Sequence, residues 1–399
     1  MAHIRYLTAG ESHGQALVGI LEGMPAGLEI CEEEIARDLQ RRQMGHGRGG
    51  RMKIEKDWAQ ILTGVRFGQT LGSPVALLIE NKDWKNWTTK MSVAPVSHSV
   101  KEVVVPRPGH ADYAGAIKYG HGDIRNVLER ASARETAMRV ALAAIARKFL
   151  AAFSIKIISH VLRIHNASSG FSVARLGTKD QAPFSLDEIS ELADRSNVRC
   201  LDEAAAERMV ARIDEAKKNR DTVGGVFEVV ALNVPVGLGS HVHWDRKLDA
   251  RIGEAMMSIP AMKGVEIGLG FEAAGMVGSD VHDPIHFDQQ THTYYRSRNH
   301  AGGLEGGITN GMPLVVRVAM KPISTLLKPL DSVNMQTHEK TAAHIERSDV
   351  CAVPAASIIG ESILSLVLAD AFLEKFGGDS VAEIRERHEA WQANVAGKK

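Results

Sequence analysis

The stretch NVLERASARETAMRVALAAIARKFLAAF, residues 126–153, contains neither glycine nor proline and is crowded with alanine. Because alanine has the highest helix propensity, the stretch predicts one long helix. Asn126 and Glu129 have the spacing of a capping pair at its start. Arginines lie in the first half, whereas the second half is mostly small or apolar, as in a helix packed closely on its neighbours. The sequence therefore predicts a central helix whose charged end faces a functional site.

Other helical and strand-like segments lie on both sides of this helix in the sequence. Helical spacing is found at residues 32–43, 246–259 and 355–376, and strand-like runs at residues 59–66, 74–80 and 314–320. Residues 165–221 are more polar and contain two amphipathic helices, at 185–195 and 203–218, so we expect a peripheral helical elaboration there. These periodicities predict a mixed α and β protein without fixing its architecture.

The composition indicates a cytoplasmic protein whose electrostatic function is local. Lysine plus arginine and aspartate plus glutamate number 48 each, so net charge supports neither nucleic-acid nor membrane binding. The N-terminus lacks the apolar segment of a signal peptide, and Glu361 and Asp370 interrupt the most apolar helix. Cys31, Cys200 and Cys351 are too far apart in the sequence to indicate a disulfide framework or a zinc knuckle.

Four clusters combine glycine with histidine, arginine or aspartate. They are GESHG at 10–14, RRQMGHGRGGRM at 41–52, RPGHADYAGAIKYGHGDIRNVLERASARET at 107–136 and HIERSDVCAVPA at 344–355. Gathered like charges repel by roughly 1 to 4 kcal/mol per pair in a wet or half-wet site, so these clusters indicate a compensating anion. Arginine forks bind phosphate and carboxylate especially well.

Each cluster also has a simpler interpretation. A histidine between glycines, such as His13, is often only an exposed turn residue, and GESHG lacks the spacing of a serine hydrolase nucleophile. RGG occurs once, without interleaved aromatic residues, which disfavours single-stranded nucleic acid. The 17 histidines show no HExxH spacing, so no metal site is predicted. Arg130 and Arg134, one turn apart on the predicted helix, would share a face, and ion pairs with neighbouring acidic residues stay open as their structural explanation.

Taken together and in this order, the clusters resemble those of the chorismate synthase family. The resemblance runs from LTAGESHG through RPGHADY, GDIRNVLERASARETAMRVA, SIPAMKGVEIG, NHAGGLEGGITNG, MKPIST and ERSDVCAVPA to the last predicted helix, and covers essentially the whole chain. It implies a single α+β domain over residues 1–399, built as a β-α-β sandwich with long central helices between two antiparallel sheets. It also implies a homotetramer.

The resemblance further implies a lyase of the shikimate pathway. This enzyme class converts 5-enolpyruvylshikimate 3-phosphate to chorismate and phosphate by 1,4-anti elimination and requires reduced FMN. The substrate carries two carboxylates and a phosphate, which would explain the gathered arginines. The sequence leaves open whether NADPH reduces the flavin on this chain or a separate flavin reductase does so. Two other classes also stay open, a non-catalytic flavin-binding or nucleotide-binding module and an RNA-binding protein.

The resemblance assigns roles to individual residues. His13 is the implied general acid that protonates the departing phosphate, and His110 is the implied donor to the N1 side of the reduced flavin. Asp349 is implied to help the flavin N5 remove the C6 proton of the substrate. The Pro-Gly turn in RPGHADY is expected to aim His110 at the flavin while Arg107 reaches the substrate.

Two sets of binding residues follow from the same resemblance. The anion-binding set is Arg42, Arg48, Arg51, Arg107 and Arg134, of which the first two also match positions for NADPH. The flavin-binding set is Arg130, Ala131, Ser132, Pro260, Ala261, Gly306, Lys321, Pro322, Ile323, Ser324, Thr325 and Arg347. The family pattern often has asparagine where this chain has Pro260, so we expect a main-chain carbonyl to serve there.

Overall fold

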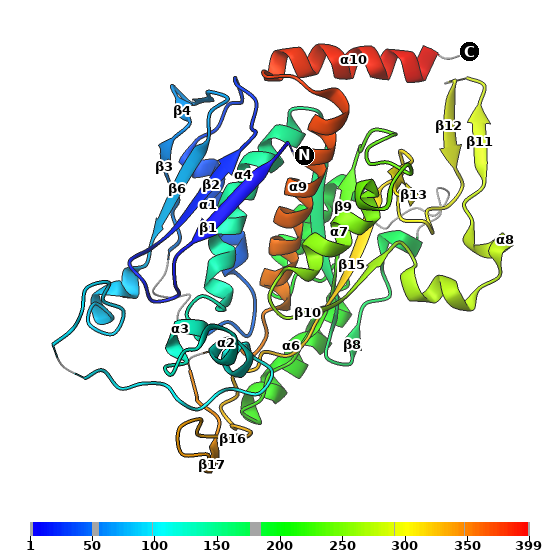
Figure 1. Cartoon of the computed structure of the whole chain (residues 1–399). Coiled ribbons are helices and arrows are strands. Elements are labelled where there is room, and N and C mark those ends of the chain that lie inside the picture. Colours follow the sequence, from blue (N-terminus) through cyan, green and yellow to red (C-terminus); the bar gives the residue numbers. More distant parts are fainter. Residues whose placement is uncertain are drawn as a thin grey trace.

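The computed structural model describes residues 3–49, 56–97, 99–175, 185–290, 292–346 and 348–397. The main elements of this part of the chain are two large antiparallel sheets and several long helices (Figure 1). The α+β class that the resemblance implied is confirmed.

The first sheet has four antiparallel strands. In spatial order they are β1 (Arg5–Ala9), β2 (Ala16–Glu22), β6 (Val75–Glu80) and β3 (Gln60–Thr63). Alternate side chains of β2 and β6, among them Leu17, Leu21 and Leu77, are fully buried. This period of two is expected when one face of a sheet packs against helices.

The second sheet has five antiparallel strands. In spatial order they are β10 (Met262–Ile267), β15 (Leu314–Met320), β9 (Gly225–Leu232), β7 (Lys156–Ile164) and β8 (Ala167–Ser168). Strands β9 and β15 are buried along most of their length. Helix α9 packs on one face of this sheet. On the other face, Ile158, Val230 and Val315 of the strands form a second hydrophobic cluster with Val173 and Ile189.

Three long helices pack against one another: α1 (Glu32–Gln43), α4 (Thr136–Ala151) and α9 (Val353–Phe376). Helix α4 contacts β2 and β6, α9 contacts β7 and β9, and the two helices pack against each other (Figure 1). Glycine permits this close approach, because a Cβ at Gly19 of β2 would lie 2.6 Å from Met138. A Cβ at Gly360 of α9 would likewise lie 2.7 Å from Phe227 of β9.

Helix α9 is long and apolar enough to cross a membrane, yet 94% of that stretch is buried inside the protein, as in a core helix. Glu361 at its middle is fully buried and accepts hydrogen bonds from Arg41 at 2.7 and 3.0 Å and from Ser159 at 2.7 Å. Arg147 and Arg199 lie 3.1 and 3.3 Å from the same carboxylate. Burial alone would raise the pKa of Glu361, but the three arginines lower it to about 2.

The helix predicted over residues 126–153 is wrong in its first third. The chain instead forms α3 (Arg125–Leu128), a 3₁₀ turn η3 (Ala133–Glu135) and then α4. Ser132 has an extended backbone, with ψ 142°, and its side chain accepts a hydrogen bond from the backbone N–H of Arg134, so it caps η3. The predicted capping pair is wrong too, because Glu129 hydrogen-bonds His13 instead.

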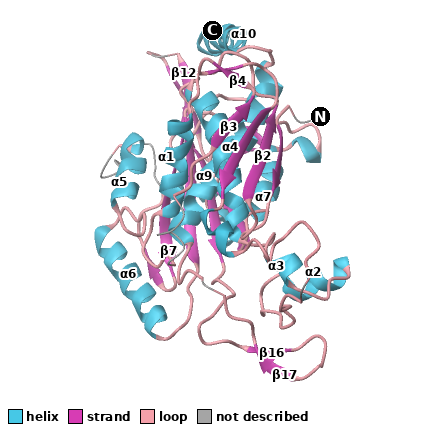
Figure 2. Ribbon diagram, turned by 90° about the vertical axis from the view of Figure 1, so that its left-hand side faces the viewer, coloured by secondary structure: helices cyan, strands magenta, loops and turns pink. Residues whose placement is uncertain are grey.

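Most other predicted segments are confirmed. Residues 32–43 and 314–320 form α1 and β15, and the predicted outer helices form α5 (Ile189–Arg195) and α6 (Glu203–Lys218). These two helices lie at the outside of the molecule (Figure 2). The sequence analysis missed α10 (Val381–Gly397), which lies across one end of α9 (Figure 1).

The remaining described elements are short and lie mainly in the connections. They are β4 (Val65–Arg66), β5 (Gln69–Thr70), η2 (Lys82–Asn86), α2 (Asp112–Tyr119), η4 (Val173–Arg175), η5 (Leu186–Glu188), η6 (Trp244–Arg246), α7 (Leu248–Met257), η7 (Gly270–Gly275), α8 (Gly278–Val281), β11 (Ile285–Asp288), β12 (Thr293–Arg296), β13 (Leu304–Glu305), β14 (Ile308–Thr309), β16 (Asp331–Val333) and β17 (Lys340–Ala342).

Candidate active site

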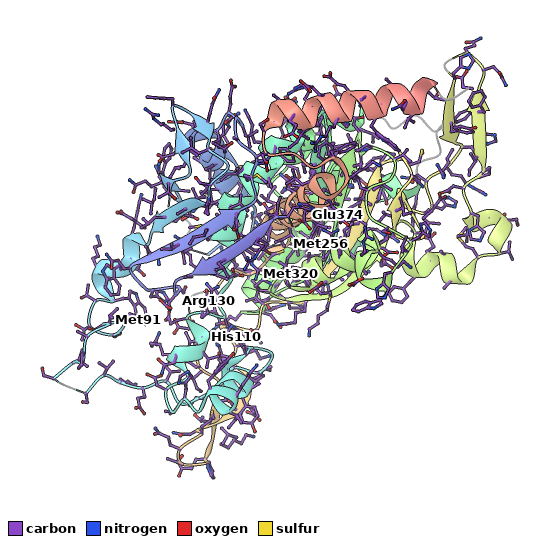
Figure 3. The ribbon with its side chains drawn as sticks, turned by 45° about the horizontal axis from the view of Figure 1, so that its top comes forward. Met91, His110, Arg130, Met256, Met320 and Glu374 are labelled. Carbon is purple, nitrogen blue, oxygen red and sulfur yellow. The ribbon has the colours of Figure 1, made fainter. Side chains whose placement is uncertain are left out.

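A cavity of about 480 Å³ lies where α1 ends and where α4 and α9 begin. Its lining residues come from distant parts of the sequence, from Ser12 to Ile359. Figure 3 labels two residues that line the cavity, Met320 near the middle of the molecule and His110 below it. Because helix N-termini carry partial positive charge, α4 and α9 both favour an anion in this cavity.

His13 lies in the turn between β1 and β2 and is held by Glu129. Its backbone N–H donates to Glu129 Oε2 at 2.8 Å, and its ring Nδ1 lies 2.9 and 3.0 Å from the two carboxylate oxygens. Trp87 stacks on the imidazole, with ring centroids 3.9 Å apart and an interplanar angle of 20°. Burial alone would raise the pKa of Glu129, but hydrogen bonds from His13 and the charge of Arg125 lower it overall.

His110 follows a turn in which Gly109 has φ +80°, a conformation that favours glycine. The ring Nδ1 of His110 lies 2.5 Å from Asp112 Oδ1, and Arg107 Nε donates to Asp112 Oδ2 at 2.8 Å. Arg107 also donates to Thr325 Oγ1 at 2.9 Å. Burial alone would raise the pKa of Asp112, but hydrogen bonds from His110 and Arg107 lower it far below its usual range. Asp112 therefore orients both an imidazole and a guanidinium.

Asp349 binds the basic loop that follows α1. Its Oδ2 accepts a hydrogen bond from Arg48 Nη1 at 2.6 Å, and its Oδ1 accepts one from the backbone N–H of Gly49 at 2.6 Å. A Cβ on Gly49 would lie 2.9 Å from the carbonyl oxygen of Ser348, so the two segments approach closely. The Asp349 carboxylate thus lies in the cavity wall beside a cation.

Arg42 and Arg134 converge on the buried carboxylate of Asp57. Arg134 Nη1 donates to Asp57 Oδ1 at 2.6 Å, and Arg42 Nη1 lies 3.8 Å from Asp57 Oδ2. Arg42 also donates to Thr136 Oγ1, at 2.8 Å from Nη2 and 3.1 Å from Nε. Burial lowers the pKa of Arg42 to about 10, although Asp57 opposes this shift. Because two buried cations face one carboxylate, an anion in the cavity would balance the remaining charge.

The cavity brings together most of the residues that the sequence analysis predicted for the site. The predicted residues that line it are His13, Arg42, Arg48, Arg107, His110, Ala131, Ser132, Arg134, Pro260, Ala261, Lys321, Ile323, Ser324, Thr325 and Asp349. They come from both the acid–base set and the two binding sets, so one cavity could hold substrate and cofactor together.

Three predicted residues, Arg130, Pro322 and Gly306, are described by the structure but are not among the cavity-lining residues. Arg130 is exposed and donates to the carbonyl oxygen of Thr8 at 2.8 Å. Because the helix breaks between α3 and α4, Arg130 and Arg134 do not share a helical face, and that prediction is wrong. Gly306 lies in the turn between β13 and β14.

Two further predicted residues, Arg51 and Arg347, lie outside the described residues. Neither the anion-binding role predicted for Arg51 nor the flavin-binding role predicted for Arg347 is therefore placed on the structure.

The sequence analysis missed the partners of the predicted residues. Asp57 and Glu129 lie 77 and 116 positions away from Arg134 and His13, so no local pattern could have linked them. Asp112 is different, since it lies two residues after His110 within the quoted RPGHADY motif. A carboxylate so near a histidine was the one signal that could have been used.

The cavity suits a guest that has both an aromatic ring and an anionic group. Part of its wall is apolar and comes from Ile259, Met262, Met320 and Ile359. Lys321 Nζ donates to the carbonyl oxygen of Gly109 at 3.0 Å, and burial lowers the pKa of Lys321. Ala261 has φ +72°, and its carbonyl oxygen accepts a hydrogen bond from the backbone N–H of Lys321 at 3.0 Å. The apolar wall and the cations beside it are the features that a flavin mononucleotide would need.

Two carboxylate-bound imidazoles, four guanidinium groups and an apolar wall around one cavity define an enzyme site. The site is suited to acid–base chemistry on a small polyanionic molecule. Among the described residues, no three histidine, cysteine, aspartate or glutamate side chains are grouped as ligands of a metal ion.

Comparison with known proteins is consistent with this class, and the chain belongs to the chorismate synthase family. The family model for chorismate synthase matches residues 4–373. The chain is 56% identical over 396 residues to chorismate synthase of Geobacter metallireducens, covering 97% of this chain and 98% of that protein. It is 55% identical over 400 residues to the Aquifex aeolicus enzyme, covering 99% of each.

A solved structure described as a crystal structure of chorismate synthase also matches. The TM-score is 0.79 with 46% sequence identity, and the match covers 98% of each chain. The chain is therefore an enzyme of the chorismate synthase type, a lyase that acts in the shikimate pathway on a small-molecule substrate.

Proposed function

We propose that the chain converts 5-enolpyruvylshikimate 3-phosphate to chorismate and phosphate by 1,4-anti elimination with reduced FMN. The observation that carries this proposal is the single cavity in which His13, His110 and Asp349 lie among four arginines. A substrate with two carboxylates and a phosphate would balance that positive charge.

The two histidines have the geometry of proton donors. In each, Nδ1 lies on a buried carboxylate. Nε2 of His13 is then the ring nitrogen that faces a guest, whereas Nε2 of His110 also lies 3.5 Å from Arg107 Nη2, so a guest there would meet the imidazole and the guanidinium together. His13 is the proposed general acid for the departing phosphate. Accepting a proton makes the phosphate a better leaving group. His110 is the proposed donor to the cofactor, and Asp112 keeps its ring in place.

The arginines are the proposed anion clamp. Arg42 and Arg134 already share Asp57, and Arg107 shares Asp112, so their guanidinium groups are oriented before substrate binds. Preorganised donors of this kind cost little reorganisation when charge develops on the departing group, and each is typically worth about 3 kcal/mol.

The proposed cofactor is reduced FMN, held by Ala131, Ser132, Pro260, Ala261 and the segment 321–325. When bound, it supplies an electron-rich ring beside the substrate. Asp349 is proposed to assist removal of the C6 proton from the substrate, and its position in the cavity wall supports this role.

An anaerobic phosphate-release assay with reduced FMN tests the function. We expect wild-type protein to release phosphate and His13→Ala and His110→Ala to lose most of the turnover, about 100-fold or more. His243→Ala serves as the control, because the His243 side chain is 61% exposed and does not line the cavity. If both cavity variants keep wild-type turnover while folded, the acid assignments are wrong.

The same assay separates the two other classes. A flavin-binding module would bind FMN without releasing phosphate from the substrate. An RNA-binding protein would release none either, and its affinity for RNA would fall steeply with salt concentration.

Adding NADPH to oxidised FMN and protein, without oxygen, decides whether the chain reduces its own flavin or needs a separate reductase. Arg42 and Arg48 are the proposed NADPH-binding residues.

We also propose that the chain folds as one domain, residues 1–399, in a β-α-β sandwich with residues 165–221 as its elaboration. The contacts of α4 with the first sheet and of α9 with the second support this layering.

The proposed cytoplasmic assembly is a homotetramer. Its support is the apolar outer face of the first sheet, where Leu7, Val18 and Ile20 are 73%, 36% and 42% exposed. Light scattering of wild type and Ile20→Lys tests it.

A further inference from the structure

One buried carboxylate lies directly behind His13, outside the wall of the cavity. The Glu129 side chain is only 1% exposed and is not among the cavity-lining residues. It accepts hydrogen bonds from the backbone N–H of His13 at 2.8 Å and from Arg125 Nη1 at 2.9 Å, in addition to its contacts with the His13 ring. The backbone N–H of Ser12 also donates to the carbonyl oxygen of Glu129 at 3.0 Å.

We propose that Glu129 is a positioning residue that fixes His13 with its Nδ1–H on the carboxylate and its Nε2 toward the cavity. The inference deepens the proposed function and rests on it. An ionised carboxylate can only accept hydrogen bonds, so the ring nitrogen at 2.9 Å must carry a proton. Nδ1 and Nε2 lie on different sides of the imidazole, and binding one therefore directs the other away from Glu129.

Trp87 removes the remaining freedom of the ring. The indole and imidazole are stacked at 3.9 Å, so the plane of His13 is held from one face while Glu129 holds its edge. Arg125 lies over the same indole, 5.0 Å from the ring centroid, and also donates to Glu129. Arg125 thus contacts both residues that hold the His13 ring, Glu129 and Trp87, and fixes their positions relative to each other.

The proton balance of the step agrees with this arrangement. When the phosphate departs, the Nε2–H bond of protonated His13 breaks and an O–H bond forms on the phosphate. The imidazole that remains is neutral and keeps its Nδ1–H on Glu129. Glu129 stays ionised throughout, because its hydrogen bonds from His13 and the charge of Arg125 outweigh the effect of burial on its pKa.

Three donors converge on Glu129, and this makes the isosteric substitution Glu129→Gln a sharp test. The two carboxylate oxygens serve the backbone N–H of His13, its ring Nδ1–H and Arg125 Nη1. A glutamine has one oxygen and one NH₂ group, so its NH₂ must face at least one of these donors. The NH₂ then faces either Arg125 or the backbone N–H of His13, and it also faces Nδ1. A ring with its proton on Nε2 can accept a hydrogen bond from this NH₂ at Nδ1, and this tautomer spoils the proposed orientation.

The experiment compares wild type, Glu129→Gln and a control, Glu135→Gln. Glu135 is also a buried glutamate near the start of α4, but it pairs with Arg139 and does not line the cavity. Steady-state phosphate release gives kcat and KM, and ¹⁵N-histidine NMR of the free enzyme reports which nitrogen of His13 carries the proton. The His13 signals are identified by their loss in His13→Ala.

We expect Glu129→Gln to lower kcat by about 10- to 100-fold with KM unchanged, and Glu135→Gln to alter neither. We also expect wild-type His13 to be the Nδ1–H tautomer when neutral, and Glu129→Gln to lose this preference. A Glu129→Gln enzyme with wild-type kcat, or one that is slow but keeps the Nδ1–H tautomer, would overturn the proposal.

The ¹⁵N-histidine spectrum of wild-type protein tests the proposal even if the Glu129→Gln variant does not fold. An Nε2–H tautomer in wild-type protein contradicts the arrangement without any substitution. Failure of the proposed function is a separate result, because wild-type protein would then release no phosphate although its NMR signals still reported the tautomer.

Discussion

The substitution Glu361→Gln in the middle of α9 tests the charge network that joins the core helices. Glu361 is fully buried and faces Arg41, Arg147 and Arg199 at 2.7 to 3.3 Å. Its pKa falls from an ordinary value of 4.5 to about 2 in the folded chain. At about 1.36 kcal/mol per pKa unit, this shift corresponds to roughly 3 kcal/mol of stability at neutral pH.

Removing the negative charge also leaves the buried guanidinium of Arg199 and the partly buried ones of Arg41 and Arg147 without the carboxylate that compensates their charge. Breaking a buried ion pair usually costs about 3 to 5 kcal/mol, which agrees with the value obtained from the pKa. We therefore expect Glu361→Gln to lower the free energy of unfolding by about 3 kcal/mol or more at pH 7, measured by urea denaturation at fixed protein concentration.

The pH dependence provides a second measurement. Because the folded-state pKa of Glu361 is lowered, its contribution is fully present above about pH 4.5 and is lost as the pH falls toward 2. The difference between wild type and Glu361→Gln should shrink over that range.

The matched control is Glu191→Gln, whose side chain pairs with Arg195 and is 69% exposed. We expect it to change stability by less than about 1 kcal/mol. A loss below about 1 kcal/mol for Glu361→Gln, or an equal loss for both variants, would refute the reasoning.

Three further outcomes are expected. Asp112→Asn removes the charge that orients His110, and phosphate release should show kcat lowered by about 10- to 100-fold with unchanged circular dichroism. Gly360→Ala places a methyl group 2.7 Å from Phe227, and urea denaturation should show a loss of about 1 to 3 kcal/mol. Burial lowers the pKa of His388 in α10, so lowering the pH below about 6.5 should destabilise the protein, and thermal unfolding of His388→Phe should show less of this dependence.

The sequence predicted those elements whose pattern depends on local propensity and on burial of one face. Residues 32–43 and 314–320 have the predicted bounds because their apolar residues recur with the helical and strand periods. The break between α3 and α4 could not be predicted in this way. No glycine or proline marks it, and it depends on Glu129 binding His13 and on Ser132 capping the next turn.

The candidate site likewise contains residues that the sequence predicted and residues that it did not. Residues in quoted motifs, such as His13, His110 and Asp349, line one cavity as the resemblance implied. Their supports could not be inferred, because Asp57 and Glu129 approach from distant positions in the chain. Spacing along a sequence indicates which residues within a few positions of each other are in contact. The charged groups that orient a side chain come from distant positions, and tertiary packing brings them to it.

The central position of α9 has a consequence for how the protein matures on the ribosome. This helix contacts the second sheet and α4, yet it spans Val353–Phe376 of a chain of 399 residues. The apolar surfaces that it covers stay uncovered until the ribosome has synthesised the chain as far as residue 376. Nascent chains must therefore avoid aggregation until α9 has been synthesised, and fragments that end before α9 lack both a complete interior and one wall of the cavity.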